Sequence, residues 1–294
     1  MKTSEEILYL RNRLGEKAAI EALAKAGFDC VDYTMDVMVR QDCILNQPGY
    51  LEYAQEIKEF ALNLGVSFNQ AHAPFEFDWW NVSIENVVIP TTIRCFEIAS
   101  TLGIDTVIVH PLHYKNYFHR SQEIWEDNLQ FFETLLPEAQ KYNIRICLEN
   151  LFQIDKRGVA LPDTCADAER YCKFLDTFHD PHLIACIDVG HACLIGEKPA
   201  DLIRALGHDR LHALHIHDNC AVKDDHTLPY LGKIDWEDVT QALADINYDG
   251  ILTLESFLFY KNFPDDFLPT AAKWQHDMAA YLATKVDSKR NQLR

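Results

Sequence analysis

The feature that most constrains the fold of this chain is a regular alternation between two kinds of segment. Short runs of apolar and β-branched residues are separated by longer segments with helical periodicity. In residues 51–65, for example, Leu51, Ala54, Ile57 and Ala61 form an apolar stripe at intervals of three and four residues. Strands that alternate with helices predict βαβ units and a parallel sheet. The predicted strands span 28–34, 66–72, 105–110, 144–150, 183–189, 211–217 and 251–256; the predicted helices span 16–26, 48–64, 82–102, 121–142, 165–178, 199–206, 235–245 and 268–285.

Seven strands and eight helices come close to the eight pairs of an α/β fold, the closed (β/α)8 TIM barrel, which usually takes about 250 residues. No linker, repeat or low-complexity tract divides the chain, so residues 1–294 are expected to form a single domain. An eighth strand should precede the helix at 16–26, where the only candidate is the poor run at 7–10. We therefore expect a first strand that is short or irregular, or a chain that begins late. A doubly wound open sheet is the alternative, but no Gly-rich phosphate-binding motif follows any predicted strand.

Polar side chains stand at the ends of the predicted strands, where the βα loops of a barrel converge. Six of the seven strands end in His, Asp or Glu, which are residue types that bind divalent metals or carry protons. Each residue alone could be structural, since a glutamate can cap a segment and an aspartate can make a turn. One polar site at the mouth of the barrel explains all of them together. These residues are His72, His110, Glu149, Asp188, His215 with His217, and Glu255.

We predict that Glu149, Asp188, His215 and Glu255 hold one divalent cation. This mixed set of ligands suits Mn²⁺, Zn²⁺, Co²⁺ or Mg²⁺ without choosing among them. Glu149 and Glu255 come from opposite sides of the predicted ring, so they could flank a substrate and act as catalytic acid and base. The cation would polarise a carbonyl or hydroxyl oxygen while a carboxylate moves the neighbouring proton.

A second set of polar residues surrounds this centre and is predicted to bind substrate or additional metal. His191 lies three residues after Asp188, and Asp224 and His226 share one loop. His217 should face inward with His215, and the pattern assigns it no role. The complete second set is His72, His110, His191, Asp224 and His226.

The composition favours a small-molecule partner. The chain has 27 Lys and Arg against 45 Asp and Glu, a net charge of −18, whereas proteins that grip nucleic acid need cationic surfaces. Nine cysteines without a CxxC pair indicate a reducing cytoplasm. No secretory signal and no apolar stretch long enough to span a membrane occurs in the sequence. Aromatic-rich loops are compatible with a homodimer.

Several motifs, in this order along the chain, resemble the xylose isomerase-like TIM-barrel superfamily, over about residues 16–260. The superfamily contains sugar and sugar-phosphate isomerases and epimerases, inosose dehydratases and type IV apurinic endonucleases. The resemblance implies a metal-dependent isomerase or epimerase of a small sugar, keto-sugar or cyclitol, phosphorylated or free, in which Glu149 and Glu255 move the proton and His191 contacts substrate. The motifs are HAPF (72–75), VIVHP (107–111), LEN (148–150), IDVGHA (187–192), HIHDN (215–219), DDHTLPYLGKIDW (224–236) and LTLES (252–256).

The resemblance also implies an alternative, a type IV apurinic endonuclease-like phosphodiesterase with up to three zinc ions. All nine positions that hold zinc in those enzymes carry a matching residue type here, namely the four predicted ligands and the five residues of the second set. The acidic net charge opposes a nucleic-acid substrate. The two loops that would face DNA, 72–83 and 110–122, hold one Lys and one Arg between them.

Overall fold

Eight parallel strands form the centre of the molecule, in a computed structural model that describes residues 1–79, 81–113 and 117–293. The order of hydrogen-bonded neighbours is β10-β1-β2-β3-β4-β5-β8-β9. The ring closes where the Ile216 amide donates to the Thr253 carbonyl at 2.9 Å and the Glu255 amide donates to the Ile216 carbonyl at 3.0 Å. The predicted (β/α)8 barrel is confirmed. Its strands are β1 (Thr3–Glu6), β2 (Cys30–Thr34), β3 (Ser67–His72), β4 (Thr106–Val109), β5 (Arg145–Glu149), β8 (Leu183–Asp188), β9 (Leu211–His215) and β10 (Leu252–Leu254).

The first strand is short, as expected, but it lies at Thr3–Glu6 and not at 7–10, where the helix α1 (Leu8–Leu14) begins. Its sequence, TSEE, contains no apolar residue, so hydrophobic patterning could not reveal it. All four residues are nevertheless buried. Ser4 Oγ donates to Asn69 Oδ1 at 2.6 Å, and the Tyr260 hydroxyl donates to Glu5 Oε1 at 2.6 Å. Polar partners on both faces of the strand, such as Asn69 and Tyr260, thus replace the apolar contacts of an ordinary strand.

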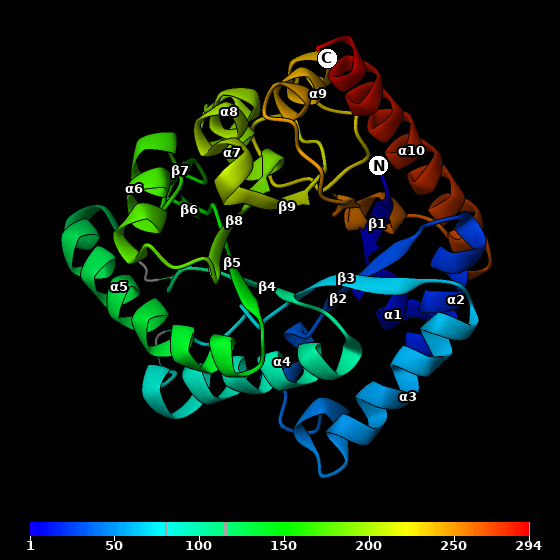
Figure 1. The fold of residues 1–294 in the computed structure, drawn as a ribbon, viewed down its shortest axis with the longest axis horizontal. Helices are drawn as coiled ribbons and strands as arrows, with labels where there is room; N and C mark the ends of the chain where they lie inside the picture. Colours follow the sequence, from blue (N-terminus) through cyan, green and yellow to red (C-terminus); the bar gives the residue numbers. More distant parts are fainter. Residues whose placement is uncertain (80, 114–116, 294) are drawn as a thin grey trace.

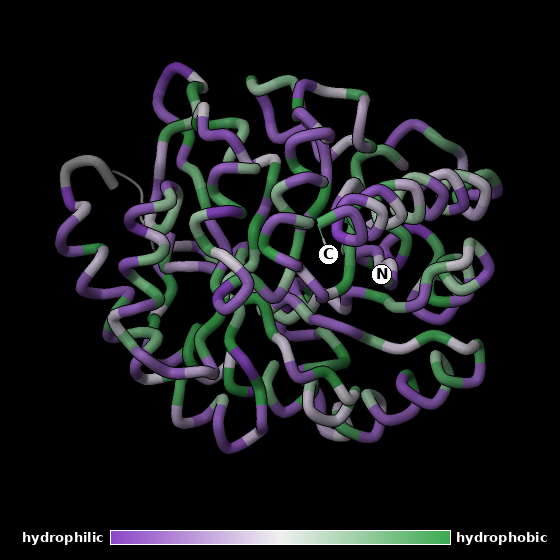
Figure 2. The backbone as a smooth tube through the Cα atoms, turned by 45° about the horizontal axis from the view of Figure 1, so that its top comes forward, coloured by the Kyte–Doolittle hydropathy of each residue, from purple (hydrophilic) through white to green (hydrophobic). Residues whose placement is uncertain are grey.

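Helices surround the barrel (Figure 1). Each of the eight predicted helices is present, and Figure 2 shows hydrophilic and hydrophobic residues alternating along them, as expected for amphipathic helices that cover a sheet. In the helix at Tyr50–Asn63, for example, the buried residues include Ala54, Ile57 and Ala61 of the predicted stripe. Among the described residues no helix is both long and apolar enough to cross a membrane. The helices are α2 (Glu16–Ala26), α3 (Tyr50–Asn63), α4 (Ile89–Leu102), α5 (Tyr117–Lys141), α6 (Ala168–Phe178), α8 (Pro199–Arg210), α9 (Trp236–Asp245) and α10 (Leu268–Gln292).

Two elements that the sequence pattern did not indicate lie beside the predicted site. A β-hairpin formed by β6 (Phe152–Ile154) and β7 (Ala160–Pro162) follows β5, and the short helix α7 (Val189–Leu194) follows β8 directly. Because α7 starts at the end of its strand, His191 is held within the first turn of a helix, and its amide donates to Asp188 Oδ1 at 2.7 Å.

The interior of the barrel is a small apolar cluster made of Ile108, Cys147, Ile184, Cys186 and Ala213. Side chains alternate between the two faces of a strand, so the inward face continues two residues further along each strand. Those next inward positions carry the predicted His110, Glu149, Asp188 and His215. The alternation of side chains therefore places these polar residues at one end of the barrel, where the strands have their carboxyl ends.

Candidate metal centre

A cavity of about 920 Å³ opens at the carboxyl ends of the strands. Seven of the nine predicted site residues line it, and the other two, Asp188 and His215, are completely buried. The predicted set is therefore assembled in one place. The seven that line the cavity are His72, His110, Glu149, His191, Asp224, His226 and Glu255.

Glu149, Asp188, His215 and Glu255 form what we call the inner cluster. Each offers one ligand atom, and these atoms all lie within 4.8 Å of one another. His215 Nδ1 is 3.1 Å from Glu149 Oε2 and 3.6 Å from Glu255 Oε2. Among the described residues, Glu149 Oε2 and both ring nitrogens of His215 are buried without a hydrogen-bond partner. Glu149 Oε2 and His215 Nδ1 face each other at 3.1 Å without a well-formed hydrogen bond, and their convergence fits a bound cation.

The charges of the inner cluster also fit a cation. Burial raises the pKa of Glu255 well above its usual value, and the nearby Glu149 and Asp188 carboxylates raise it further. For Glu149 burial acts in the same direction, but His215 and His110 outweigh it and lower the pKa. Ionisation of Glu255 beside the Glu149 and Asp188 carboxylates is therefore unfavourable, and a positive charge at this point would favour it.

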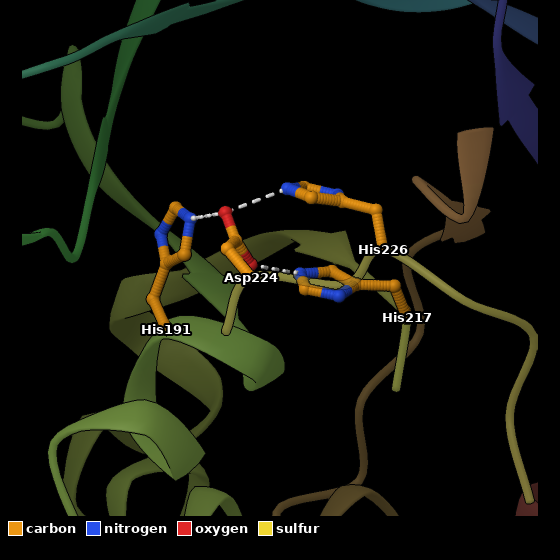
Figure 3. A group of neighbouring side chains, drawn as sticks. All are labelled: His191, His217, Asp224 and His226. Carbon is orange, nitrogen blue, oxygen red and sulfur yellow. Dashed lines mark hydrogen bonds and ion pairs between the residues drawn. The ribbon is translucent and has the colours of Figure 1, made fainter. Parts of the chain in front are cut away.

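His191, His217, Asp224 and His226 form a second group, which we call the outer cluster (Figure 3). Asp224 lies at its centre: Oδ2 is 2.9 Å from His226 Nε2 and 3.5 Å from His191 Nε2, and Oδ1 is 3.9 Å from His217 Nε2. The three predicted residues of this group thus come together, and the structure adds His217. These four side chains could hold a second metal ion.

His217 connects the two clusters. Its Nε2 lies 3.0 Å from both carboxylate oxygens of Asp188, and its ring stacks on that of His226 with centroids 3.9 Å apart. The Gly190 of the DVGHA motif makes this possible, since a Cβ there would stand 2.0 Å from Cε1 of His217. Strand parity predicts the inward orientation of His217, but its partner could be found only from the structure.

His72 and His110 lie against the glutamates of the inner cluster. His110 Nε2 is 3.0 Å from Glu149 Oε2, and His72 Nε2 is 3.6 Å from Glu255 Oε1. Burial would lower the pKa of His72, but the adjacent Asp32 carboxylate reverses this and raises it to about 10.

Asp32 is a site residue that sequence reasoning missed. It is fully buried on β2, its Oδ1 lies 3.2 Å from His72 Nδ1, and its Oδ2 lies 3.7 Å from His215 Nε2. Gln70 Nε2 donates to Oδ2 at 2.8 Å and holds the carboxylate in place. Asp32 therefore contacts two histidines of the site, His72 and His215. The available signal was a carboxylate in the middle of the apolar run FDCVDYT, two residues from the strand end.

Asp218, in the HIHDN motif, has a structural role in the loop that follows β9. Its carboxylate accepts hydrogen bonds from Trp236 Nε1 at 2.8 Å and from the amides of Tyr230 and Ile234 at 3.0 and 3.2 Å. These bonds fasten the loop that carries Asp224 and His226. Asp218 of the HIHDN motif, together with Ile234 and Trp236 of the KIDW segment, thus helps to position the outer cluster.

The fold and the site together define a class: a parallel (β/α)8 barrel with metal-ligand side chains gathered at the carboxyl ends of its strands. Residues 20–284 match the family described as xylose isomerase-like TIM barrel, and the chain belongs to this family.

Named relatives in other organisms include sugar epimerases. A D-psicose 3-epimerase of Ruminiclostridium cellulolyticum is 22% identical over 253 residues, 82% of this chain and 78% of that protein. The uncharacterized protein y4fM of Sinorhizobium fredii is 29% identical over 167 residues, 54% of this chain. This match spans 50% of the length of y4fM.

Solved structures share the fold over nearly the whole chain. A D-tagatose 3-epimerase-like protein superposes with a TM-score of 0.74 at 22% identity and covers 100% of both chains. The IOLI protein, solved with a bound zinc atom, gives a TM-score of 0.74 at 18% identity and covers 99% of both chains. At these low sequence identities, the structural similarity shows that the fold is shared.

Proposed function

We propose that this protein is a divalent-metal-dependent isomerase or epimerase of a small sugar, keto-sugar or cyclitol. The observation that carries the proposal is the inner cluster, in which three carboxylates and one imidazole converge beside a cavity of about 920 Å³. The sugar epimerases among the relatives and the zinc in the IOLI structure support the same reading.

Glu149, Asp188, His215 and Glu255 would hold one cation, which when bound supplies the positive charge that polarises a substrate oxygen. The proton is moved by the protein. Glu149 and Glu255 come from β5 and from the residue after β10, so they approach the cavity from different sides of the barrel. One glutamate would take the proton from the carbon next to a carbonyl, and the other would return it on the opposite face. His72 and His110, against these glutamates, would hold substrate oxygens.

Hydrogen exchange from solvent tests this proposal. Metal-loaded protein in D₂O, given a panel of ketoses and cyclitols, should introduce deuterium at a carbon next to the carbonyl of at least one of them, as read by NMR. Chelation should stop the exchange, and returning Mn²⁺, Zn²⁺, Co²⁺ or Mg²⁺ should restore it. Exchange that survives removal of the metal would refute the proposal.

A second candidate is a phosphodiesterase with up to three zinc ions, and the outer cluster is the observation that favours it. Besides its three histidines, Asp224 Oδ1 is buried without a hydrogen-bond partner among the described residues. The net charge of −18 opposes a DNA substrate. Metal analysis separates the candidates: about three zinc ions per chain, together with salt-sensitive cleavage of an abasic oligonucleotide, would support the phosphodiesterase. One ion per chain supports the isomerase or epimerase.

A further inference from the structure

One wall of the cavity carries carboxylates that belong to neither cluster. Glu6 is the last residue of β1, Asp36 follows β2 by two residues, and Glu76 lies in the loop after β3. These strands are consecutive in the barrel, so the three residues share one side of the cavity. We call Glu6, Asp36 and Glu76 the acidic wall.

Glu6 is the best-defined member of the wall. Its side chain lines the cavity although the residue is only 3% exposed. Oε1 accepts a hydrogen bond from the Leu8 amide at 2.7 Å, whereas Oε2 has no partner among the described residues. Burial raises its pKa to about 8, and the charge of Asp32 acts in the same direction. A buried carboxyl oxygen without a partner costs free energy, which a ligand donor would recover.

Asp36 is held in place by neutral groups. Its Oδ1 accepts from the Phe75 amide at 3.0 Å, and its Oδ2 accepts from the Thr34 hydroxyl at 3.3 Å. These donors fix the direction of the carboxylate without neutralising it. Glu76 is exposed at the rim and adds negative charge there.

The other carboxylates of the site form ion pairs with basic side chains, whereas no described residue forms an ion pair with the wall. Asp32 pairs with His72, Asp188 with His217, and Asp224 with the histidines of the outer cluster. His72 and, less strongly, Arg11 lower the pKa of Glu6, but neither forms an ion pair with it. His72 pairs with Asp32, and the buried Arg11 donates to the Thr34 carbonyl at 2.7 Å.

One cationic side chain other than histidine lines the described part of the cavity, and it lies away from the wall. This is Lys156, in the hairpin that follows β5. β5 stands four strands from β1 in the ring of eight, on the opposite side of the barrel. A divalent ion at the inner cluster would offset charge there and not at the wall, where Asp36 and Glu76 remain without an ion pair among the described residues.

We infer that the substrate carries a protonated amino group, which binds against Glu6 and Asp36. The inference rests on the proposed function and narrows its substrate class to amino-substituted sugars or cyclitols. Without a ligand Glu6 keeps its proton near neutral pH, and an ammonium group would supply both the positive charge that favours its carboxylate and a hydrogen-bond donor for Oε2. A hydroxyl supplies only the donor, and a phosphate meets like charge on this side of the cavity.

Binding measurements test the inference directly. The probes are D-fructose, its 1-amino-1-deoxy and 6-amino-6-deoxy derivatives, and its 1- and 6-phosphates, each titrated calorimetrically into the metal-loaded protein. We expect one amino sugar to bind at least ~10-fold more tightly than fructose, and the phosphate at the same carbon to bind ~100-fold less tightly than the amino sugar. The variants Glu6→Gln and Asp36→Asn should each reduce the amino preference ~10-fold. Glu133→Gln, which removes an exposed charge on α5, is the matched control and should leave the preference unchanged.

The results separate this inference from the proposed function. Equal or tighter binding of fructose or a phosphate, or an amino preference that survives in both wall variants, would overturn the inference. Two variants are used because Glu6 is buried and Asp36 is not, so a folding defect in the first leaves the second informative. An amino sugar that binds as expected but is never deuterated would preserve the inference and count against the isomerase. Binding of none of the probes would contradict both.

Discussion

The inner and outer clusters are built from the same residue types in opposite proportions. The inner cluster has three carboxylates and one histidine, and the outer cluster has three histidines and one carboxylate. In the outer cluster burial would raise the pKa of Asp224, but His226 and His191 outweigh it and lower the pKa well below the usual value. In the inner cluster burial raises the pKa of Glu255, and the Glu149 and Asp188 carboxylates raise it further. The outer cluster thus contains its own counter-charges, whereas an added cation would favour the ionised form of Glu255 in the inner cluster.

The largest effect should come from the proton-moving carboxylates of the inner cluster. Glu149→Gln and Glu255→Gln keep an oxygen at each position but remove the base, so solvent hydrogen exchange should fall ~10³-fold or more. Circular dichroism and melting should show that the fold survives. Full activity in both variants would remove the functional distinction between the clusters.

A smaller effect is expected from the outer cluster. Asp224→Asn removes the charge that orients His191 and His226, so kcat/KM should fall ~10–100-fold. The affinity of the inner cluster for its metal, measured by competition with a chelator, should change less than ~3-fold, since Asp224 is not among its ligands. An equal loss of metal affinity would show that the two clusters form one site.

Asp32 tests how far the inner cluster depends on its support. In the wild type the Asp32 carboxylate lies 3.7 Å from Nε2 of His215 and favours the ring orientation that points Nδ1 toward Glu149 and Glu255. Asp32→Asn removes this charge, so it should weaken metal binding ~10–30-fold. Metal affinity is the readout, and Glu133→Gln serves again as the control. Unchanged affinity would limit Asp32 to the positioning of His72.

Much of the barrel and the assembly of the site residues could be predicted from the sequence, because both depend on local patterns. Strand alternation determines which side chains point inward, and the carboxyl ends of parallel strands meet at one end of the barrel. Glu149, Asp188 and His215 follow these rules, so they could be named together.

What the sequence did not reveal depends on partners distant along the chain. β1 is polar and buried, and its role follows from contacts with residues such as Asn69 and Tyr260. Asp32 is mid-strand, and its importance comes from His72 and from His215, which is 183 positions away. No periodicity within one segment reports such pairings.

The smallest expected effect concerns Glu6, a carboxyl group that lies outside both clusters. Its pKa is about 8 in the folded protein and ordinarily 4.5, so between these values the native state keeps a proton that the unfolded chain has lost. The free energy of unfolding must therefore fall as pH rises through this range. In metal-free Glu6→Gln the decline between pH 5 and 7 should be less steep by about 1 kcal/mol per pH unit, as measured by urea unfolding. Asp36→Asn is the matched comparison and should leave the slope near that of the wild type. Parallel curves for Glu6→Gln and the wild type would mean that the Glu6 carboxyl already has a charged partner.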